Sequence, residues 1–261
     1  MCLISLAWQQ HEDYPLVMAA NRDEFLARAS QEMHFWNSQP HILAGRDLVA
    51  GGTWMGFSKH GRFAALTNIR HPDYFKAGQL SRGELIPDYL NAKLSTQQWS
   101  QWLKDNHTSY HGFNLIFGDA EGIYYFGSNQ PDVVSLEPGI YGLCNADLNT
   151  PWPKVQKAQE QMSSWIKSPD LQSLSLLHST SEVADDTLLP STGIPIDLER
   201  SLSAQKIALP EYGTRTQSGI IVDRQGTLQV TEISIDKGNS KQSFTIEGFW
   251  KHAENDANGS V

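Results

Sequence analysis

The residue types best suited to chemistry lie close to the amino terminus. Cys2 follows the initiator methionine, and a polar run, Asn21-Arg22-Asp23-Glu24, follows an apolar stretch. If Met1 is removed, as is common before a small side chain, Cys2 carries a thiol and a free α-amine, with ordinary pKa values of about 8.5 and about 7.7–8.0. One residue then supplies a nucleophile and a base. The Arg22 charge favours the thiolate, and the Asp23 carboxylate can hold the amine in place.

Simple strand pairing returns this polar run to Cys2. The predicted strand 2–8 pairs with the predicted strand 15–21 across a polar turn, and symmetric pairing places Cys2 opposite Asn21. Neighbouring residues on an extended strand point to opposite faces, so the arginine and the aspartate that follow both reach Cys2 only if the chain turns there. The plain alternative is that the cysteine is a small hydrophobe starting a strand and that the polar run is a solvated turn.

A second predicted hairpin adds a side-chain amide. In TWMGFSKHGRFAALTNIR a turn at 59–61 pairs Ser58 with Arg62, which returns Asn68 to the glycines at 51–52. Paired glycines allow a substrate or another backbone to approach closely. The Asn68 amide N–H is suited to stabilising an oxyanion in acyl transfer. Its alternative role is that of an ordinary strand-end turn residue.

The wider pattern predicts the elements that position these residues. Short runs rich in β-branched and aromatic residues alternate with helical patterns, and strands flank a helix-rich middle. Strands are predicted near 2–8, 15–21, 53–58, 62–68, 113–118, 122–127, 139–144, 217–223, 227–235 and 242–249, and helices near 82–92, 96–104, 152–167, 170–178, 181–188 and 197–205. This order indicates stacked antiparallel sheets covered by helices, in one domain over 1–250 with a disordered tail at 251–261.

Composition excludes several functions. The 29 acidic and 20 basic residues give no positive field for nucleic acid or an anionic membrane surface. Two cysteines, and a first apolar run too short for a signal peptide or a membrane span, predict a cytoplasmic protein without stable membrane insertion. His107 and His111 have i, i+4 spacing but lack the glutamate of HExxH, so no metal site is expected. Cys144 is expected to be a buried, inert thiol. The oligomeric state is left open.

Several separated motifs resemble one family. MCLI at the start, NRDE at 21–24, GGTWMG at 51–56, TN at 67–68, NADLNTPWPKV at 145–155 and YGTR at 212–215 occur in the order typical of the NRDE family, also called the transport and Golgi organisation family. The resemblance covers most of the chain. That family is similar to the N-terminal-nucleophile (Ntn) hydrolase superfamily, which implies an α+β fold, a four-layer αββα sandwich of two antiparallel sheets covered by helices. In the cysteine branch of this superfamily, which includes bile-salt hydrolases and penicillin V acylases, a cysteine exposed by methionine removal cleaves amides.

The resemblance implies roles for individual residues. Cys2 matches the nucleophile in type and position, and Asn68 matches the oxyanion amide. The branch usually separates its arginine and aspartate by a couple of residues, whereas here they are adjacent. The implied site is Cys2, Arg22, Asp23, Asn68, Asn145 and Arg215. Asn145 has an alternative role in an Asx-turn, and Arg215 as an exposed edge-strand arginine.

Two functions follow as expectations. One is a cysteine hydrolase or acyltransferase that needs no cofactor and acts on an amide or thioester of a small or lipid-like substrate. The alternative is a non-catalytic carrier of haem or a lipid-like ligand in the same cleft, because a thiolate can also ligate iron. In either case the loops at 31–50 and 69–80 are expected to form the pocket walls.

Overall fold

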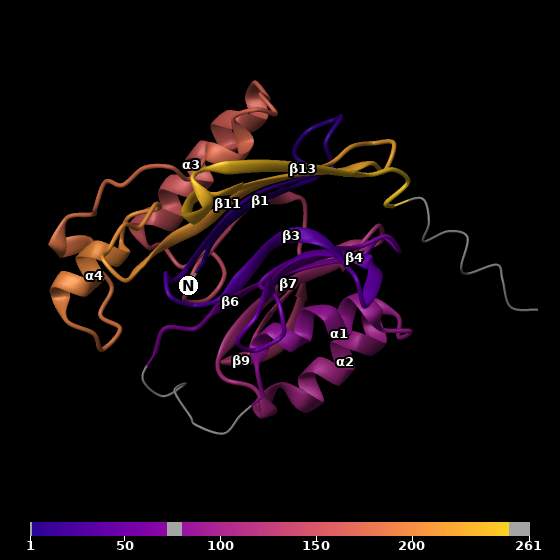
Figure 1. The fold of residues 1–261 in the computed structure, drawn as a ribbon, viewed down its shortest axis with the longest axis horizontal. Helices are drawn as coiled ribbons and strands as arrows, with labels where there is room; N and C mark the ends of the chain where they lie inside the picture. The colour runs from indigo at the N-terminus through magenta and orange to yellow at the C-terminus, as the bar shows by residue number, and fades with distance from the viewer. Residues whose placement is uncertain (1, 72–79, 251–261) are drawn as a thin grey trace, which may run out of the picture.

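Two antiparallel sheets stack face to face, and helices cover their outer faces (Figure 1). This computed structural model describes residues 2–71 and 80–250, so the predicted tail at 251–261 lies outside it. The six-stranded sheet has the order β10 (Gly139–Leu143), β1 (Cys2–Trp8), β2 (Leu16–Phe25), β11 (Tyr212–Val222), β12 (Leu228–Ser234) and β13 (Ser240–Ile246). The seven-stranded sheet runs in sequence order through β3 (Ser30–Trp36), β4 (Gln39–Asp47), β5 (Met55–Ser58), β6 (Phe63–Asn68), β7 (Phe113–Asp119), β8 (Gly122–Gly127) and β9 (Gln130–Ser135).

The helices divide between the two outer faces. α1 (Leu85–Asn91) and α2 (Thr96–Asn106) cover the seven-stranded sheet, and α3 (Pro153–Lys167) covers the six-stranded sheet (Figure 1). A capping box starts α2, in which Ser95 Oγ accepts from the Gln98 amide and Gln98 Oε1 accepts from the Ser95 amide. The short helix α4 (Ile196–Leu202) lies beside the end of β2 and the start of β11, where Leu198 and Leu202 are close to Phe25 and Tyr212. The arrangement is the predicted αββα sandwich.

Burial on both faces explains the nearly continuous apolar sequence of β1. Ile4 and Leu6 pack into the core between the two sheets, whereas Leu3 and Ala7 pack beneath α3. A strand covered on both sides cannot alternate between apolar and polar residues. The first hairpin therefore forms the middle of the sheet, with β10 on one side and β11 on the other.

The first hairpin is paired one residue away from the predicted register. Trp8 lies opposite Leu16, and Cys2 lies opposite Arg22 instead of Asn21. The Gln9 amide donates to the Pro15 carbonyl, so Gln9 pairs with Pro15 and the second strand is shifted by one residue relative to the prediction. The second hairpin has the predicted register, since the Ser58 amide donates to the Arg62 carbonyl.

Three strands were not predicted, namely β3, β4 and β9. The β3–β4 hairpin occupies most of the segment that was expected to be a loop at 31–50. Its pairing shifts register at two places, and such bulges interrupt the period-two alternation by which strands are predicted. β9 lies at the sheet edge, where its side chains are mostly exposed and Pro131 is tolerated.

Candidate active site

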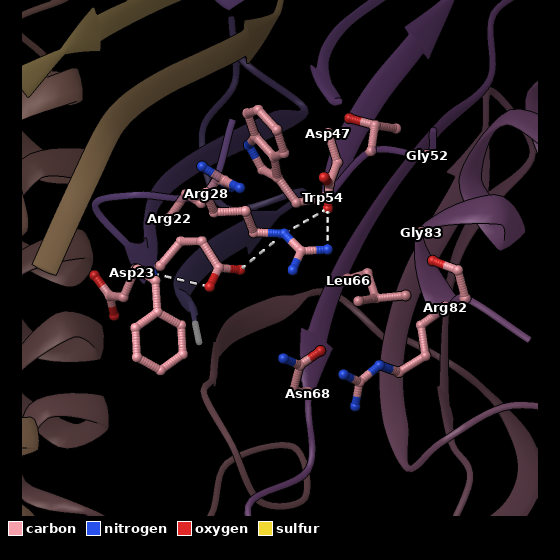
Figure 2. Close-up of a pocket in the computed structure, with 14 residues that line it drawn as sticks. Arg22, Asp23, Arg28, Asp47, Gly52, Trp54, Leu66, Asn68, Arg82 and Gly83 are labelled. Atoms are coloured by element: carbon pink, nitrogen blue, oxygen red, sulfur yellow. Dashed lines mark hydrogen bonds and ion pairs between the residues drawn. The ribbon is translucent and has the colours of Figure 1, made fainter. Parts of the chain in front are cut away.

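A polar pocket opens where β2 and β6 end, between the two sheets. Its volume is about 300 Å³, the lower end of the range of small-molecule sites. Figure 2 shows several of its lining side chains, which come from both sheets and from the turn before α1. The lining residues are Arg22, Asp23, Glu24, Phe25, Arg28, Asp47, Gly52, Thr53, Trp54, Leu66, Asn68, Ser81, Arg82 and Gly83. Three predicted site residues are thus brought together: Arg22, Asp23 and Asn68.

Arg22 fixes the position of residue 2 relative to this pocket. The two residues are directly paired across β1 and β2, while the Cys2 side chain itself is outside what the structure describes. The Arg22 guanidinium lies 4.0 Å from the Trp54 ring centroid, and the side chain is buried. An arginine stacked on an aromatic face holds its orientation.

Asp23 points to the opposite face of β2 from Arg22. Its Oδ1 accepts from Thr214 Oγ1 at 2.6 Å, and its backbone carbonyl accepts from the Tyr212 hydroxyl at 3.0 Å. Burial raises the pKa of Asp23 above its ordinary value, and the Lys154 charge and the Thr214 hydrogen bond oppose that rise. β2 stays extended to Phe25, so the chain does not turn at 22–23. Arg22 and Asp23 both line the pocket because it lies where β2 ends.

Lys154 is a charged residue that sequence reasoning missed. It lies in the first turn of α3, is 3 % exposed, and its Nζ has no hydrogen-bond partner among the described residues. A buried cation there is unusual, because the helix dipole disfavours positive charge at the amino end. The signal in the sequence that could have identified Lys154 was its position within the motif NADLNTPWPKV, at the start of the predicted helix. Its charge acts on Asp23.

Asn68 and Asn145 are joined by a hydrogen bond. Asn145 Nδ2 donates to the Asn68 carbonyl at 2.8 Å, and Asn145 Oδ1 accepts from the Cys144 thiol at 3.0 Å. Asn145 is buried and lines a neighbouring pocket with Arg70, whose amide donates to the Asn145 carbonyl. The Asn68 side-chain amide makes no hydrogen bond with the residues that the structure describes, and it faces the polar pocket (Figure 2). Asn145 therefore holds the strand end that presents Asn68.

Arg215 is not brought to the pocket. It sits at a bulge in β11, is buried, and its Nε donates to Asp236 Oδ2 at 2.7 Å. Its Nη1 donates to the Phe25 carbonyl at 3.3 Å and to the Arg28 carbonyl. The guanidinium thus fastens the turn after β2, which carries Arg28 into the pocket. It is neither exposed nor at a sheet edge, contrary to the alternative considered from the sequence.

An apolar pocket adjoins the polar one. It has a volume of about 370 Å³ and shares Glu24, Phe25, Asn68 and Arg82 with the polar pocket. Its other lining residues are Ile69, Arg70, Ile194, Leu198, Leu202, Leu209 and Tyr212. Of the two loops expected to supply the walls, the first contributes Asp47 to the polar pocket and the second contributes Ile69 and Arg70 here, while 72–79 lies outside the described residues.

Two close-packed glycines bring Arg82 into the site. A Cβ on Gly52 would lie 2.3 Å from the Gly83 carbonyl carbon, and the Thr53 amide donates to the Gly83 carbonyl at 3.0 Å. The paired glycines of GGTWMG thus admit another backbone, as their type predicted. Nothing in the sequence near Arg82 indicated this contact.

Across residues 2–71 and 80–250, no group of three or more His, Cys, Asp or Glu side chains is arranged to hold a metal ion. Over the same residues, no helix has the length and apolar character needed to cross a membrane.

Comparison with known proteins identifies relatives over most of the chain. The family model described as Transport and Golgi organisation 2 matches residues 1–237. The Homo sapiens protein named Transport and Golgi organization protein 2 homolog is 35% identical over 243 residues, covering 85% of this chain and 87% of the human protein.

Solved structures with the same fold are distant in sequence. A mutant of conjugated bile acid hydrolase from Clostridium perfringens superposes with a TM-score of 0.50 at 8% identity, covering 94% of this chain and 96% of its own. The Caenorhabditis elegans ortholog of N-acylethanolamine-hydrolyzing acid amidase has a TM-score of 0.50 at 10% identity, covering 84% and 92%. The sandwich is therefore the Ntn-hydrolase fold that the sequence motifs implied.

Proposed function

This chain belongs to the Transport and Golgi organisation 2 family, and on that premise we propose that it is a cysteine Ntn hydrolase or acyltransferase acting on an amide or thioester of a small or lipid-like substrate. The observation that carries the proposal is the pairing of residue 2 with Arg22, which lines the polar pocket. Fold alone would not suffice, because one fold hosts many functions.

The proposed reaction assigns one task to each group. The Cys2 thiolate, favoured by Arg22, attacks the carbonyl carbon, and the carbonyl electron pair moves to oxygen. The Asn68 amide donates to that oxyanion. The α-amine of residue 2, held by Asp23, carries the thiol proton to the leaving group, which departs as an amine or thiol. Water or another acceptor then attacks the thioester, which frees the acyl group and restores the thiol.

Two observations support amide or thioester chemistry at this site. The structural neighbours include a conjugated bile acid hydrolase and an N-acylethanolamine-hydrolyzing amidase, each named for breaking an acyl bond. The Asn68 amide faces the pocket without a partner among the described residues, as an oxyanion donor must before substrate binds.

The free, buried Cys144 agrees with the reducing environment of the cytoplasm, where we place the protein.

The competing proposal is a carrier, and the apolar pocket is the observation that favours it. A lipid-like chain fits that pocket without any reaction at Cys2. Haem fits less well, because the described lining residues of the two pockets include no His or Met, which leaves Cys2 as the proposed thiolate ligand.

The test is covalent trapping on the full chain. Intact mass first establishes whether Met1 is removed, which the amine-assisted mechanism requires. The protein is then incubated with acyl-amide, acyl-thioester and haem probes, and mass spectrometry locates any acyl adduct while absorption spectra report haem. We expect an adduct on residue 2 of the parent and of Cys144→Ser, and none in Cys2→Ala. Undiminished turnover in Cys2→Ala would refute the nucleophile.

A further inference from the structure

The polar and apolar pockets meet at a seam, and the seam contains a cation, Arg82, that makes no close ion pair with the described residues. Arg82 lines both pockets. Within the described part of the chain its guanidinium makes one hydrogen bond, to the Gly112 carbonyl at 3.0 Å, and no ion pair. Burial lowers the pKa of Arg82 from its ordinary value, the nearby Glu24 charge opposes that shift and the Arg28 charge adds to it, but an arginine still stays charged at neutral pH.

The acidic residues nearby are already occupied. Arg28 Nη2 lies 2.7 Å from Asp47 Oδ2, and its Nε lies 3.9 Å from Glu24 Oε2. The other Glu24 carboxylate oxygen accepts the Phe25 amide at 2.9 Å. Since a half-buried guanidinium gains most from a carboxylate that it can bind with two N–H groups, Arg82 is the group at the seam left to receive an anion.

Arg82 is held by backbone contacts and so presents its charge at a fixed place. The Gly52–Gly83 approach anchors the turn that carries it, and the guanidinium extends toward Asn68 (Figure 2). Asn68 is the proposed oxyanion donor. An anion bound to Arg82 therefore lies close to the scissile carbonyl and not at the far end of a long substrate.

The apolar pocket has firm walls. Leu198 and Leu202 come from α4, and the Arg70–Glu199 ion pair at 2.8 Å ties that helix to the end of β6. On the other side Phe25 packs edge-on against Tyr212, with ring centroids 5.2 Å apart. A preformed apolar cavity favours an unbranched hydrocarbon chain by roughly threefold to fourfold in affinity per methylene buried.

We infer that this site takes an N-acyl amino acid: an apolar acyl chain fills the pocket beside α4, and the α-carboxylate of the amine portion binds Arg82. The inference rests on the proposed function for the acyl bond, which Cys2 would cleave to a free fatty acid and an amino acid with water consumed. The recognition itself does not require cleavage.

The test measures binding in a full-length Cys2→Ala background, which cannot turn over. The matched probes are N-dodecanoylglycine and N-dodecanoylethanolamine, which share a chain and an amide and differ in the carboxylate. By titration calorimetry we expect the glycine probe to bind about tenfold tighter or more. Arg82→Gln should abolish that preference, and Arg82→Lys, which keeps the charge but loses the fork, should retain part of it.

Controls separate recognition from folding and from chemistry. Arg224 is exposed at the opposite end of the β strands, so Arg224→Gln should keep the preference. Leu198→Gln should weaken the binding of both probes alike, because Leu198 lines only the apolar pocket proposed for the acyl chain that the two probes share. Equal affinity for the two probes, or an unchanged preference in Arg82→Gln, overturns the inference even if the wild type cleaves an amide. A preference that depends on Arg82 upholds it even if no probe is cleaved, which would refute only the hydrolase.

Discussion

The buried ion pair between Arg70 and Glu199 holds α4 in place, and α4 forms one wall of the apolar pocket. The two side chains are 7% and 2% exposed, and Glu199 Oε1 also accepts from the Thr192 amide at 2.9 Å. Arg70→Met keeps much of the side-chain volume over Trp152 but leaves the carboxylate buried without its cation. Removing one partner of such a pair costs about 3–5 kcal/mol of unfolding free energy.

A surface pair in the same chain serves as the matched control. Lys157 and Glu182 lie 2.7 Å apart, nearly the same distance, but their side chains are 39% and 74% exposed. Lys157→Met should therefore change the unfolding free energy far less than Arg70→Met does. Both variants are compared with the parent by urea unfolding at pH 7, using the linear dependence of free energy on denaturant.

A double variant isolates the charge. Arg70→Met with Glu199→Gln removes both charges and keeps an acceptor oxygen for Thr192, so it should be more stable than Arg70→Met alone by about 1–3 kcal/mol. The reasoning fails if Arg70→Met and Lys157→Met are equally stable, or if the double variant is no better than the single one.

Four further outcomes are expected. Cys2 should alkylate with iodoacetamide faster than Cys144 near neutral pH, because Cys144 is buried and donates its thiol to a neighbouring amide; equal rates in the folded chain would contradict an activated Cys2. Burial raises the pKa of Glu232 to about 7 from 4.5, so the folded chain keeps a proton that the unfolded chain has lost. Its contribution to stability therefore falls as the pH rises from about 4.5 to 7, and Glu232→Gln should remove that fall. Burial lowers the pKa of His178 to about 3 from 6.5, so the unfolded chain takes up a proton that the folded chain does not. Stability is therefore lost as the pH falls below about 6.5, and His178→Gln should remove this pH dependence. Urea unfolding across a pH series tests the Glu232 and His178 predictions, and parallel stability curves for the parent and a variant would contradict the prediction for that residue. Arg215→Met should lower the unfolding free energy by about 2–3 kcal/mol, because the hydrogen bonds from Arg215 to the turn after β2 are lost. If Arg215 acts only on that turn, the Cys2 alkylation rate should stay within about twofold of the parent rate. A larger change in that rate would show that Arg215 acts on the thiol.

The sequence was sufficient where local pattern and strand length decide the outcome. The strand at 2–8, the helix that begins at Thr96 and the return of Asn68 to Gly52 all follow from residue type and spacing within a single hairpin or turn. The first register was wrong by one residue because the turn closes at Gln9, an effect of loop geometry that residue patterns do not carry.

The missed features depend on contacts between distant segments. Arg82 enters the site through the Gly52–Gly83 approach, and Lys154 is buried by the packing of α3 on the sheet. Trp54 stood within a recognised motif, but its place over Arg22 requires the two sheets to be stacked. No periodicity along the chain reports these arrangements, because the partners are far apart in sequence.

The central position of the first hairpin sets the order in which the molecule can be completed. Its edges are covered by β10 and by β11, and Thr214 meets Asp23 across 191 positions of sequence. Until β11 has been synthesised, β2 has a bare edge and apolar side chains on both faces, a state prone to pairing with other chains. Closing so long a loop is slow, because its entropy must be lost before the pairing compensates. The apolar pocket is thus among the last parts to form, because Tyr212 lines it and a nascent chain that stops short of residue 212 lacks that part of its wall.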